Sequence, residues 1–217
     1  MKFTSGDDID AGLCTALMHE YFRCHDYFTQ FAKFGEQMIL NGRTKELSYR
    51  AYNAYAGFVQ HLYEFLMGCY AREQGDTGII SAKGKGEDRH KMLDAMIFSS
   101  TQRIINKRKD SIEKGDAPEW ENDISYFCEP IPREFPQEFR KFRNKISGHV
   151  SYLRASELSL TEFYGKYHKY LGLLYQDGKH FWGRKDGEFP DLKEITEFSV
   201  MLEEEMTNKV RMNQVSK

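Results

Sequence analysis

Residues 54–70 read AYAGFVQHLYEFLMGCY. Within this stretch, apolar side chains recur at steps of three and four residues, at Tyr55, Phe58, Leu62, Phe65 and Cys69. Steps of this size place side chains along one side of an α-helix, which turns once in about 3.6 residues. The stretch therefore predicts a buried, coiled-coil-like seam in a helix that starts near Thr44 and ends near Gly75.

The same helical period continues on both sides of this seam. It predicts a long first helix from about Asp8 to Leu40, ended by Asn41-Gly42, two residue types that tolerate a left-handed cap. Further helices are expected over about residues 88–114, 136–153, 159–176 and 192–209. The fold class is therefore all-α: a bundle of five to six helices, of which the first two are long.

The expected connections are marked by glycine and proline. Residues 75–90 hold several glycines and little periodicity, and residues 120–136 hold Pro130, Pro132 and Pro136. The sequence Ser159-Leu-Thr-Glu162 is a capping-box pattern that opens the helix after them. We expect one helical bundle over residues 1–178, with a loop or hairpin and an acidic helix in residues 179–217 packed on the same domain.

Charge is unevenly distributed, although the net charge is only −2. Residues 133–154 hold six basic and two acidic side chains, a net of +4, whereas residues 186–206 hold eight acidic side chains and one lysine, a net of −7. The whole chain is therefore not a general polyanion binder. The basic stretch predicts a local surface that attracts anions, and an exposed helix face explains the acidic stretch equally well.

Several classes of protein are disfavoured by the sequence. The start, MKFTSGDDID, has no apolar run typical of a signal peptide, and no stretch holds the eighteen or so apolar residues that a membrane span needs. The four cysteines are widely spaced without a CxxC pair, so we expect reduced, mostly buried thiols. These features predict a cytoplasmic protein that does not enter a membrane.

The basic stretch contains a helix with a patterned charge. Phenylalanines and aliphatic residues form one stripe at Phe135, Phe139, Phe142, Ile146, Val150 and Leu153. At about 100° per residue, Arg143 falls about 60° to one side of this stripe and His149 about 60° to the other. Both side chains would therefore border the packed face and reach a groove formed with a partner helix.

An arginine and a histidine in such a groove suit the cleavage of RNA by its own 2′-OH. Histidine populates both its acid and base forms near neutral pH, so it can take the 2′-OH proton or protonate the leaving oxygen. A guanidinium matches the oxygens of a phosphate and stabilises the charge that develops on it. This chemistry needs no metal and no cofactor.

The motif Arg143-Asn144-Lys-Ile-Ser-Gly-His149, late in an all-α bundle, resembles the HEPN superfamily. The resemblance implies a homodimer, whose two-fold axis would place two copies of the motif around one groove, and a metal-independent endoribonuclease of phage defence or of a toxin–antitoxin pair. Arg143 and His149 would be catalytic and Asn144 supporting. Neighbouring residues expected to support the site or bind RNA are Arg140, Lys141, Lys145 and Ser147. The implied partners are RNA, a second copy of the chain and an antitoxin-like protein.

Other interpretations stay open. The motif departs from a HEPN subgroup in which Tyr follows His at the second position, since here Tyr152 follows His149 at the third. The same helix also fits a non-catalytic module that binds RNA or a nucleotide, or an α-helical interaction protein whose basic helix merely contacts a partner. His61 and Glu64 are expected to form a surface or seam pair or, alternatively, His61 faces the groove. The acidic run Glu203-Glu204-Glu205 is expected to be a solvated face.

Overall fold

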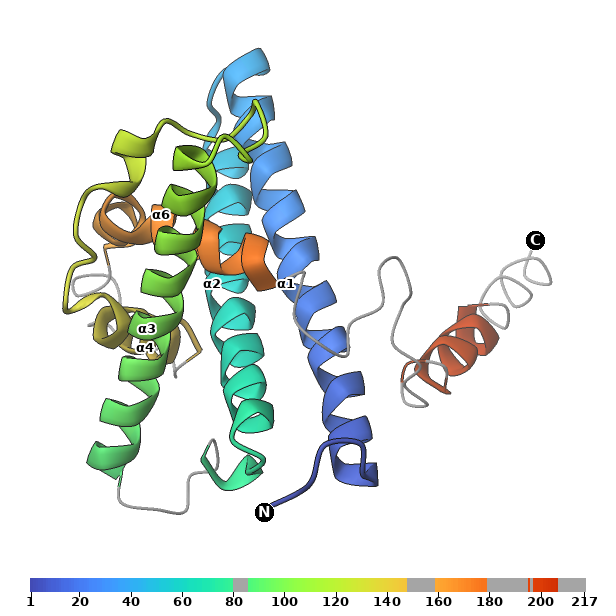
Figure 1. Ribbon diagram of the computed structural model, residues 1–217. Helices are drawn as coiled ribbons and strands as arrows, with labels where there is room; N and C mark the ends of the chain where they lie inside the picture. Colours follow the sequence, from blue (N-terminus) through green and yellow to red (C-terminus); the bar gives the residue numbers. More distant parts are fainter. Residues whose placement is uncertain (80–85, 148–158, 179–194, 196, 207–217) are drawn as a thin grey trace. The chain divides into compact units, whose positions relative to one another are not determined.

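The computed structural model describes residues 1–79, 86–147, 159–178, 195 and 197–206 of the chain (Figure 1). Within these residues all regular secondary structure is helical, apart from an isolated antiparallel bridge between Lys2 and Asp76. The predicted all-α fold is confirmed. The chain forms two compact units, Met1–Arg184 and Lys185–Lys217.

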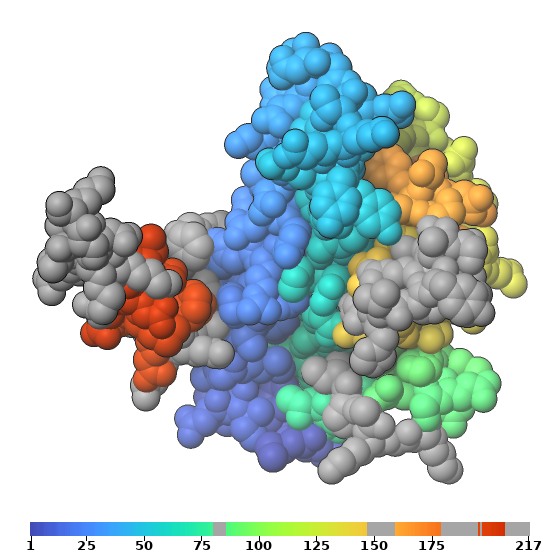
Figure 2. Space-filling model, turned by 180° about the vertical axis from the view of Figure 1, so that it is seen from behind, coloured from blue at the N-terminus to red at the C-terminus, as the bar shows by residue number. Residues whose placement is uncertain are grey.

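The first two helices are long and lie side by side. Helix α1 spans Asp8–Asn41 and helix α2 spans Lys45–Glu73, close to the predicted bounds (Figures 1 and 2). Asp7 and Thr44 cap them, each accepting a hydrogen bond from a backbone N–H in the first turn. Gly42 separates the two helices with a φ of 82°, a left-handed conformation that favours glycine. The predicted helix end at this position is confirmed.

Helix α2 is the centre of the bundle, where it contacts α1 and the later described helices α3, α4 and α6. The predicted seam is confirmed, because Tyr55, Phe58 and Leu62 are each at most 1% exposed. Val59 and Leu66, on other sides of the helix, are also fully buried. Burial on several sides explains why the second half of α2 is apolar nearly all round.

The remaining elements in the described part of this unit follow in chain order. They are η1 (Thr77–Ile79), α3 (Gly86–Glu113), η2 (Ile124–Phe127), α4 (Phe135–Ser147) and α6 (Leu160–Gly178). The 3₁₀ helices η1 and η2 occupy stretches that were predicted to be irregular. η2 forms because the side chain of Asp123 caps it, accepting a hydrogen bond from the backbone N–H of Ser125 at 2.9 Å. At the start of α6, Ser159 Oγ accepts from the backbone N–H of Glu162 at 3.1 Å, as the capping box predicts.

In the second unit, residues 197–206 are helical and exposed, and they include the run Glu203-Glu204-Glu205. The predicted hairpin near residues 179–189 lies outside the described residues, and the packing of residues 179–217 on the bundle stays a prediction. Of the helices in the described ranges, none is both long and apolar enough to cross a membrane.

The four cysteines differ in their surroundings. Cys24 and Cys69 are buried, Cys14 is half-buried and Cys128 is exposed, and none forms a disulfide. Burial raises the pKa of the Cys24 and Cys69 thiols well above the ordinary value. These two thiols therefore behave as small apolar side chains of the core, as predicted, whereas Cys128 does not.

Candidate functional site

The predicted catalytic arginine lies on α4, and aromatic packing fixes this helix in place. Phe139 is fully buried, and its ring meets that of Tyr63 on α2 edge-on, with centroids 5.2 Å apart. Phe142 stacks on Phe163 of α6 at 4.2 Å. These contacts confirm the predicted apolar stripe over the described part of α4, and they hold the helix between α2 and α6.

Arg143 extends from α4 towards α2. Its Nη2 forms an ion pair with Oε1 of Glu64, and its Nη1 donates a hydrogen bond to Oδ1 of Asn144 at 3.0 Å. The guanidinium carbon lies 5.7 Å from the centroid of the Tyr63 ring, within reach of a cation–π interaction. The side chain is 31% exposed, which agrees with the predicted position at the border of the packed face.

Arg140 lies one turn before Arg143 and connects α4 to α3. Its Nε and Nη2 donate to the two carboxylate oxygens of Asp94, at 3.0 and 2.8 Å. This hydrogen bonding raises the pKa of Arg140, so the guanidinium stays charged. Both side chains are less than one-fifth exposed. A bidentate pair of this kind fixes the orientation of two helices, so Arg140 is suited to positioning α4.

These arginines open on a small pocket between α2, α3 and α4. Its volume is about 140 Å³. The residues that line it are Tyr63, Glu64 and Met67 from α2, Arg89, His90 and Leu93 from α3, and Arg140, Arg143 and Asn144 from α4. Three of the predicted site residues therefore meet in one place, together with a third arginine and a histidine from α3.

Sequence reasoning missed Arg89 and His90, although a signal for Arg89 was present. The buried stripe of α3 includes Leu93 and Ile97, four residues apart. Arg89 precedes Leu93 by another four residues, so it extends the same face by one turn towards the start of the helix. A basic side chain that extends an apolar stripe by one turn is expected at the edge of the interface that the stripe forms. This pattern could have identified Arg89 from the sequence.

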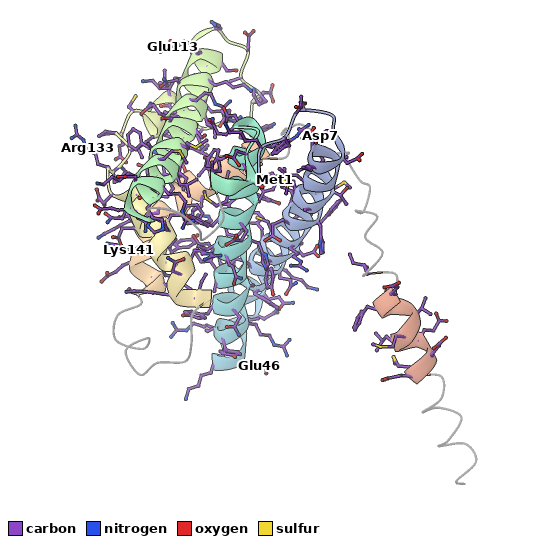
Figure 3. All side chains as sticks on the ribbon, turned by 90° about the horizontal axis from the view of Figure 1, so that it is seen from below. Met1, Asp7, Glu46, Glu113, Arg133 and Lys141 are labelled. Atoms are coloured by element: carbon purple, nitrogen blue, oxygen red, sulfur yellow. The ribbon has the colours of Figure 1, made fainter. Side chains whose placement is uncertain are left out.

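Lys141 and Lys145 lie on a different side of α4. They line a groove of about 420 Å³ between α4 and α6, together with Glu134, Glu138, Phe142, Ser159, Glu162, Phe163, Lys166 and Tyr167. Lys141 is labelled in Figure 3, and its Nζ lies 2.9 Å from Oε1 of Glu138. The predicted basic residues are thus divided between two faces of the helix, and the second face carries acidic side chains as well.

The remaining predicted residues lie at the end of α4. Asn144 is exposed, yet its side-chain oxygen reaches back to Arg143, which fits a supporting role for that residue. Ser147 is the last described residue of α4, and its side chain is not among the described ones. His149 lies outside the described residues, so the Arg143–His149 pairing stays a prediction.

The electrostatics of the pocket favour an anion. Of the described residues, three guanidinium groups and one carboxylate line it, and a second carboxylate, that of Asp94, is already held by Arg140. Burial raises the pKa of Tyr63 to about 12. The Tyr63 phenol therefore stays protonated at neutral pH, where it can donate a hydrogen bond but cannot act as a base.

Other candidate groups lie elsewhere. His61 faces α1, where its Nδ1 lies 2.6 Å from Oε1 of Glu20 and its ring stacks on Tyr27 at 5.2 Å. It therefore belongs to the α1–α2 seam and not to the pocket. Among the side chains that the structure describes, no three His, Cys, Asp or Glu residues gather closely enough to hold a metal ion.

Comparisons with known proteins were made at three levels. No protein-family model, curated protein or solved structure matches the chain. The chemistry of the site therefore rests on the motif of α4 and on the contacts described above.

Proposed function

We propose that the protein is a metal-independent endoribonuclease of the HEPN type, acting in phage defence or as the toxin of a toxin–antitoxin pair. The observation that carries the proposal is the position of Arg143 at the border of α4, in the motif that ends at His149. The Glu64 carboxylate and the Tyr63 ring orient this guanidinium at the edge of the pocket. An oriented cation beside a groove is what phosphoryl transfer requires.

The proposed chemistry follows from the two motif residues. One His149 imidazole takes the proton of a ribose 2′-OH, whose oxygen attacks the adjacent phosphorus, and a second protonates the departing 5′ oxygen. Arg143 stabilises the charge that develops on the phosphorane, and Asn144 holds the guanidinium by accepting its Nη1 hydrogen. The products are one strand with a 2′,3′-cyclic phosphate and one with a free 5′-OH.

Two histidines at one phosphate require two copies of α4, so we propose a composite site at a homodimer groove. In this arrangement Lys141 and Lys145 contact the RNA backbone beside the groove. Arg140 positions the helix through Asp94. An antitoxin-like protein is the proposed partner that restrains the enzyme, and the cytoplasm, where such substrates occur, is its proposed location.

The test is RNA cleavage by purified protein in EDTA, with the product ends analysed. We expect 2′,3′-cyclic phosphate ends from the wild type and a loss of at least about 100-fold for His149→Ala, the usual scale for removing a general acid or base. His25→Ala, which changes a histidine of α1 that contacts Tyr175, is the matched control and should keep full activity. Equal cleavage by wild type and His149→Ala would overturn the proposal.

A second candidate is a non-catalytic module that binds RNA or a nucleotide. The observation that favours it is the set of three arginines that line the pocket, because guanidinium groups can hold a phosphate without any proton transfer. This candidate predicts RNA affinity that falls steeply with salt and survives His149→Ala, without any cleavage. The cleavage assay above, combined with a filter-binding titration at two salt concentrations, distinguishes the two functions.

A further inference from the structure

We propose that the pocket between α2, α3 and α4 is a phosphate-binding site of a single chain, in which the Glu64 carboxylate occupies Arg143 until a phosphate group displaces it. The site goes beyond the ribonuclease proposal, because it requires neither His149 nor a second copy of the chain. Its ligand is the phosphate of a phosphomonoester, such as a nucleotide or the phosphorylated end of an RNA strand.

The donors of the pocket are arranged for an oxyanion. The Nε of Arg143 is buried and has no hydrogen-bond partner among the described residues, while Nη2 is taken by Glu64. A buried donor without a partner destabilises the fold. An anion that binds Nε and Nη2 together would remove this free-energy penalty, because it accepts a hydrogen bond from each. Glu64 pairs with Nη2 and leaves Nε without a described partner, whereas a phosphate with three terminal oxygens can accept a hydrogen bond from both nitrogens.

The balance of charge also favours this exchange. Among the described residues that line the pocket, three are arginines, Arg89, Arg140 and Arg143, and one is a carboxylate, Glu64. Asp94 is held by both of its oxygens and keeps Arg140 in place. A phosphate that displaces Glu64 therefore meets the Nε and Nη2 of Arg143, in a pocket that Arg89 and Arg140 also line.

The size of the pocket limits what can enter. The volume of the pocket is about 140 Å³, below the roughly 300–1,000 Å³ of pockets that enclose a drug-sized ligand. A tetrahedral phosphate group with a few waters fits this space, but a ribose and a base do not. The rest of a nucleotide would therefore lie outside, and a phosphomonoester, with about −1.5 to −2 charges at pH 7, would bind better than a diester.

The experiment is a calorimetric titration of the full chain at constant ionic strength, with inorganic phosphate, adenosine 5′-monophosphate and the phosphodiester dimethyl phosphate as separate probes. We expect saturable binding of the first two and at least tenfold weaker binding of the third. Arg143→Gln and Arg89→Gln should each weaken phosphate binding about tenfold, because each removes a charged donor. Glu64→Gln should strengthen it several-fold, because it removes the competing carboxylate.

Lys91→Gln is the matched control, since it removes an exposed positive charge from the same helix, two residues after Arg89. Its affinity for phosphate should equal that of the wild type. Absence of saturable binding by the wild type, or equal weakening by Lys91→Gln, would overturn the site. Weaker or unchanged binding by Glu64→Gln would overturn the role given to that carboxylate.

A measurement on the wild-type chain tests the site even if the variants fail to fold. In nitrogen-15 NMR spectra, the Nε–H signals of Arg89 and Arg143 should shift saturably with phosphate, and unmoved signals count against the site. Because no RNA is present, the titration is separate from the cleavage assay. If the chain binds phosphate but does not cut RNA, the phosphate site is supported and the ribonuclease proposal fails. If it cuts RNA but does not bind phosphate, the ribonuclease proposal is supported and the phosphate site fails.

Discussion

At the scale of single residues, Asp10 is a buried charged group of the described part of the chain. Its carboxylate is only 3% exposed, and it accepts hydrogen bonds from Arg72 Nη2 at 3.0 Å and from the backbone N–H of Gly6 at 2.8 Å. The bonds from Arg72 and then Gly6 hold the pKa of Asp10 at about 2. The ion pair thereby fixes the beginning of α1, which follows Asp7 in Figure 3, to the end of α2.

This pair predicts a pH-dependent stability. The carboxylate has a lower pKa in the folded chain than in the unfolded chain, so its contribution is present above about pH 4 and is lost as the pH falls through about 2. We expect Asp10→Asn to lower the melting temperature by about 5 °C or more at pH 7 and to reduce the loss of stability between pH 5 and pH 2. Circular dichroism melting curves measure both effects.

The control for this change is Asp8→Asn, which removes an exposed carboxylate from the same turn of α1. Its melting curve at pH 7 should lie within about 2 °C of the wild type. If Asp10→Asn and Asp8→Asn had the same melting temperature at every pH, the Asp10–Arg72 ion pair would make no measurable contribution to stability.

At the scale of elements, α1 and α2 approach closely because α2 presents glycines to α1. A Cβ added at Gly57 would lie 2.4 Å from the ring of Tyr27, and one added at Gly68 would lie 2.6 Å from Leu17 Cδ2. Tyr27 also stacks on His61, so its ring has little freedom to move. The seam therefore depends on the missing side chain at Gly57 more than on that at Gly68, where only the end of a flexible leucine must shift.

Gly57→Ala should accordingly destabilise the chain by about 1–3 kcal/mol through overpacking, although alanine favours helices by about 1 kcal/mol over glycine. Gly165→Ala in α6 is the matched control, because an added Cβ meets nothing within 4 Å there. That variant should be more stable than the wild type by up to about 1 kcal/mol. Urea unfolding of both variants tests the pair, and a stabilising Gly57→Ala would show that α1 can move away from α2 without cost.

The helix α4 shows how far the sequence alone determines the site. The position of Arg143 at the border of the packed face follows from the helical period, which is a local property, and it was predicted. Its partner Glu64 and the neighbouring Arg89 depend on where α2 and α3 lie relative to α4, and no local pattern contains that information. The place of Lys141 likewise depends on α6, because the groove that it lines is formed between α4 and α6.

The fold was more predictable than the site for a related reason. Helix bounds depend on caps and periodicity within a few residues. Signals of this kind at Thr44 and Ser159 predicted where the two helices begin. The 3₁₀ helix at residues 124–127 was missed because a single turn capped by Asp123 has no period to detect.

At the scale of the whole molecule, the buried apolar core belongs to the first unit. Its members lie between Leu17 and Tyr175, and α6 alone buries eight residues, namely Phe163, Tyr167, Tyr170, Leu171, Leu173, Leu174, Tyr175 and Gly178. A core supplied by residues up to 178 should fold without the residues of the second unit.

Truncation after Arg184 is therefore expected to leave the helical spectrum of the bundle intact and its melting temperature within about 3 °C of the full chain. Truncation before Ser159, which removes α6, should abolish cooperative melting, because the apolar faces that pack on α6 become exposed. A strongly lowered melting temperature after the first truncation would show that residues 185–217 stabilise the bundle by packing on it.

The pocket at Arg143 is lined by one chain, and this has a kinetic consequence. A site that each chain forms alone binds in proportion to the protein concentration, however dilute the sample is. A groove shared by two chains exists only in the associated fraction, so below the dissociation constant of the dimer the total reaction rate rises with the square of the chain concentration. If the chain cuts RNA as proposed, the reaction order of that cleavage, set beside the phosphate stoichiometry per chain, reports how many copies of α4 act at one bond.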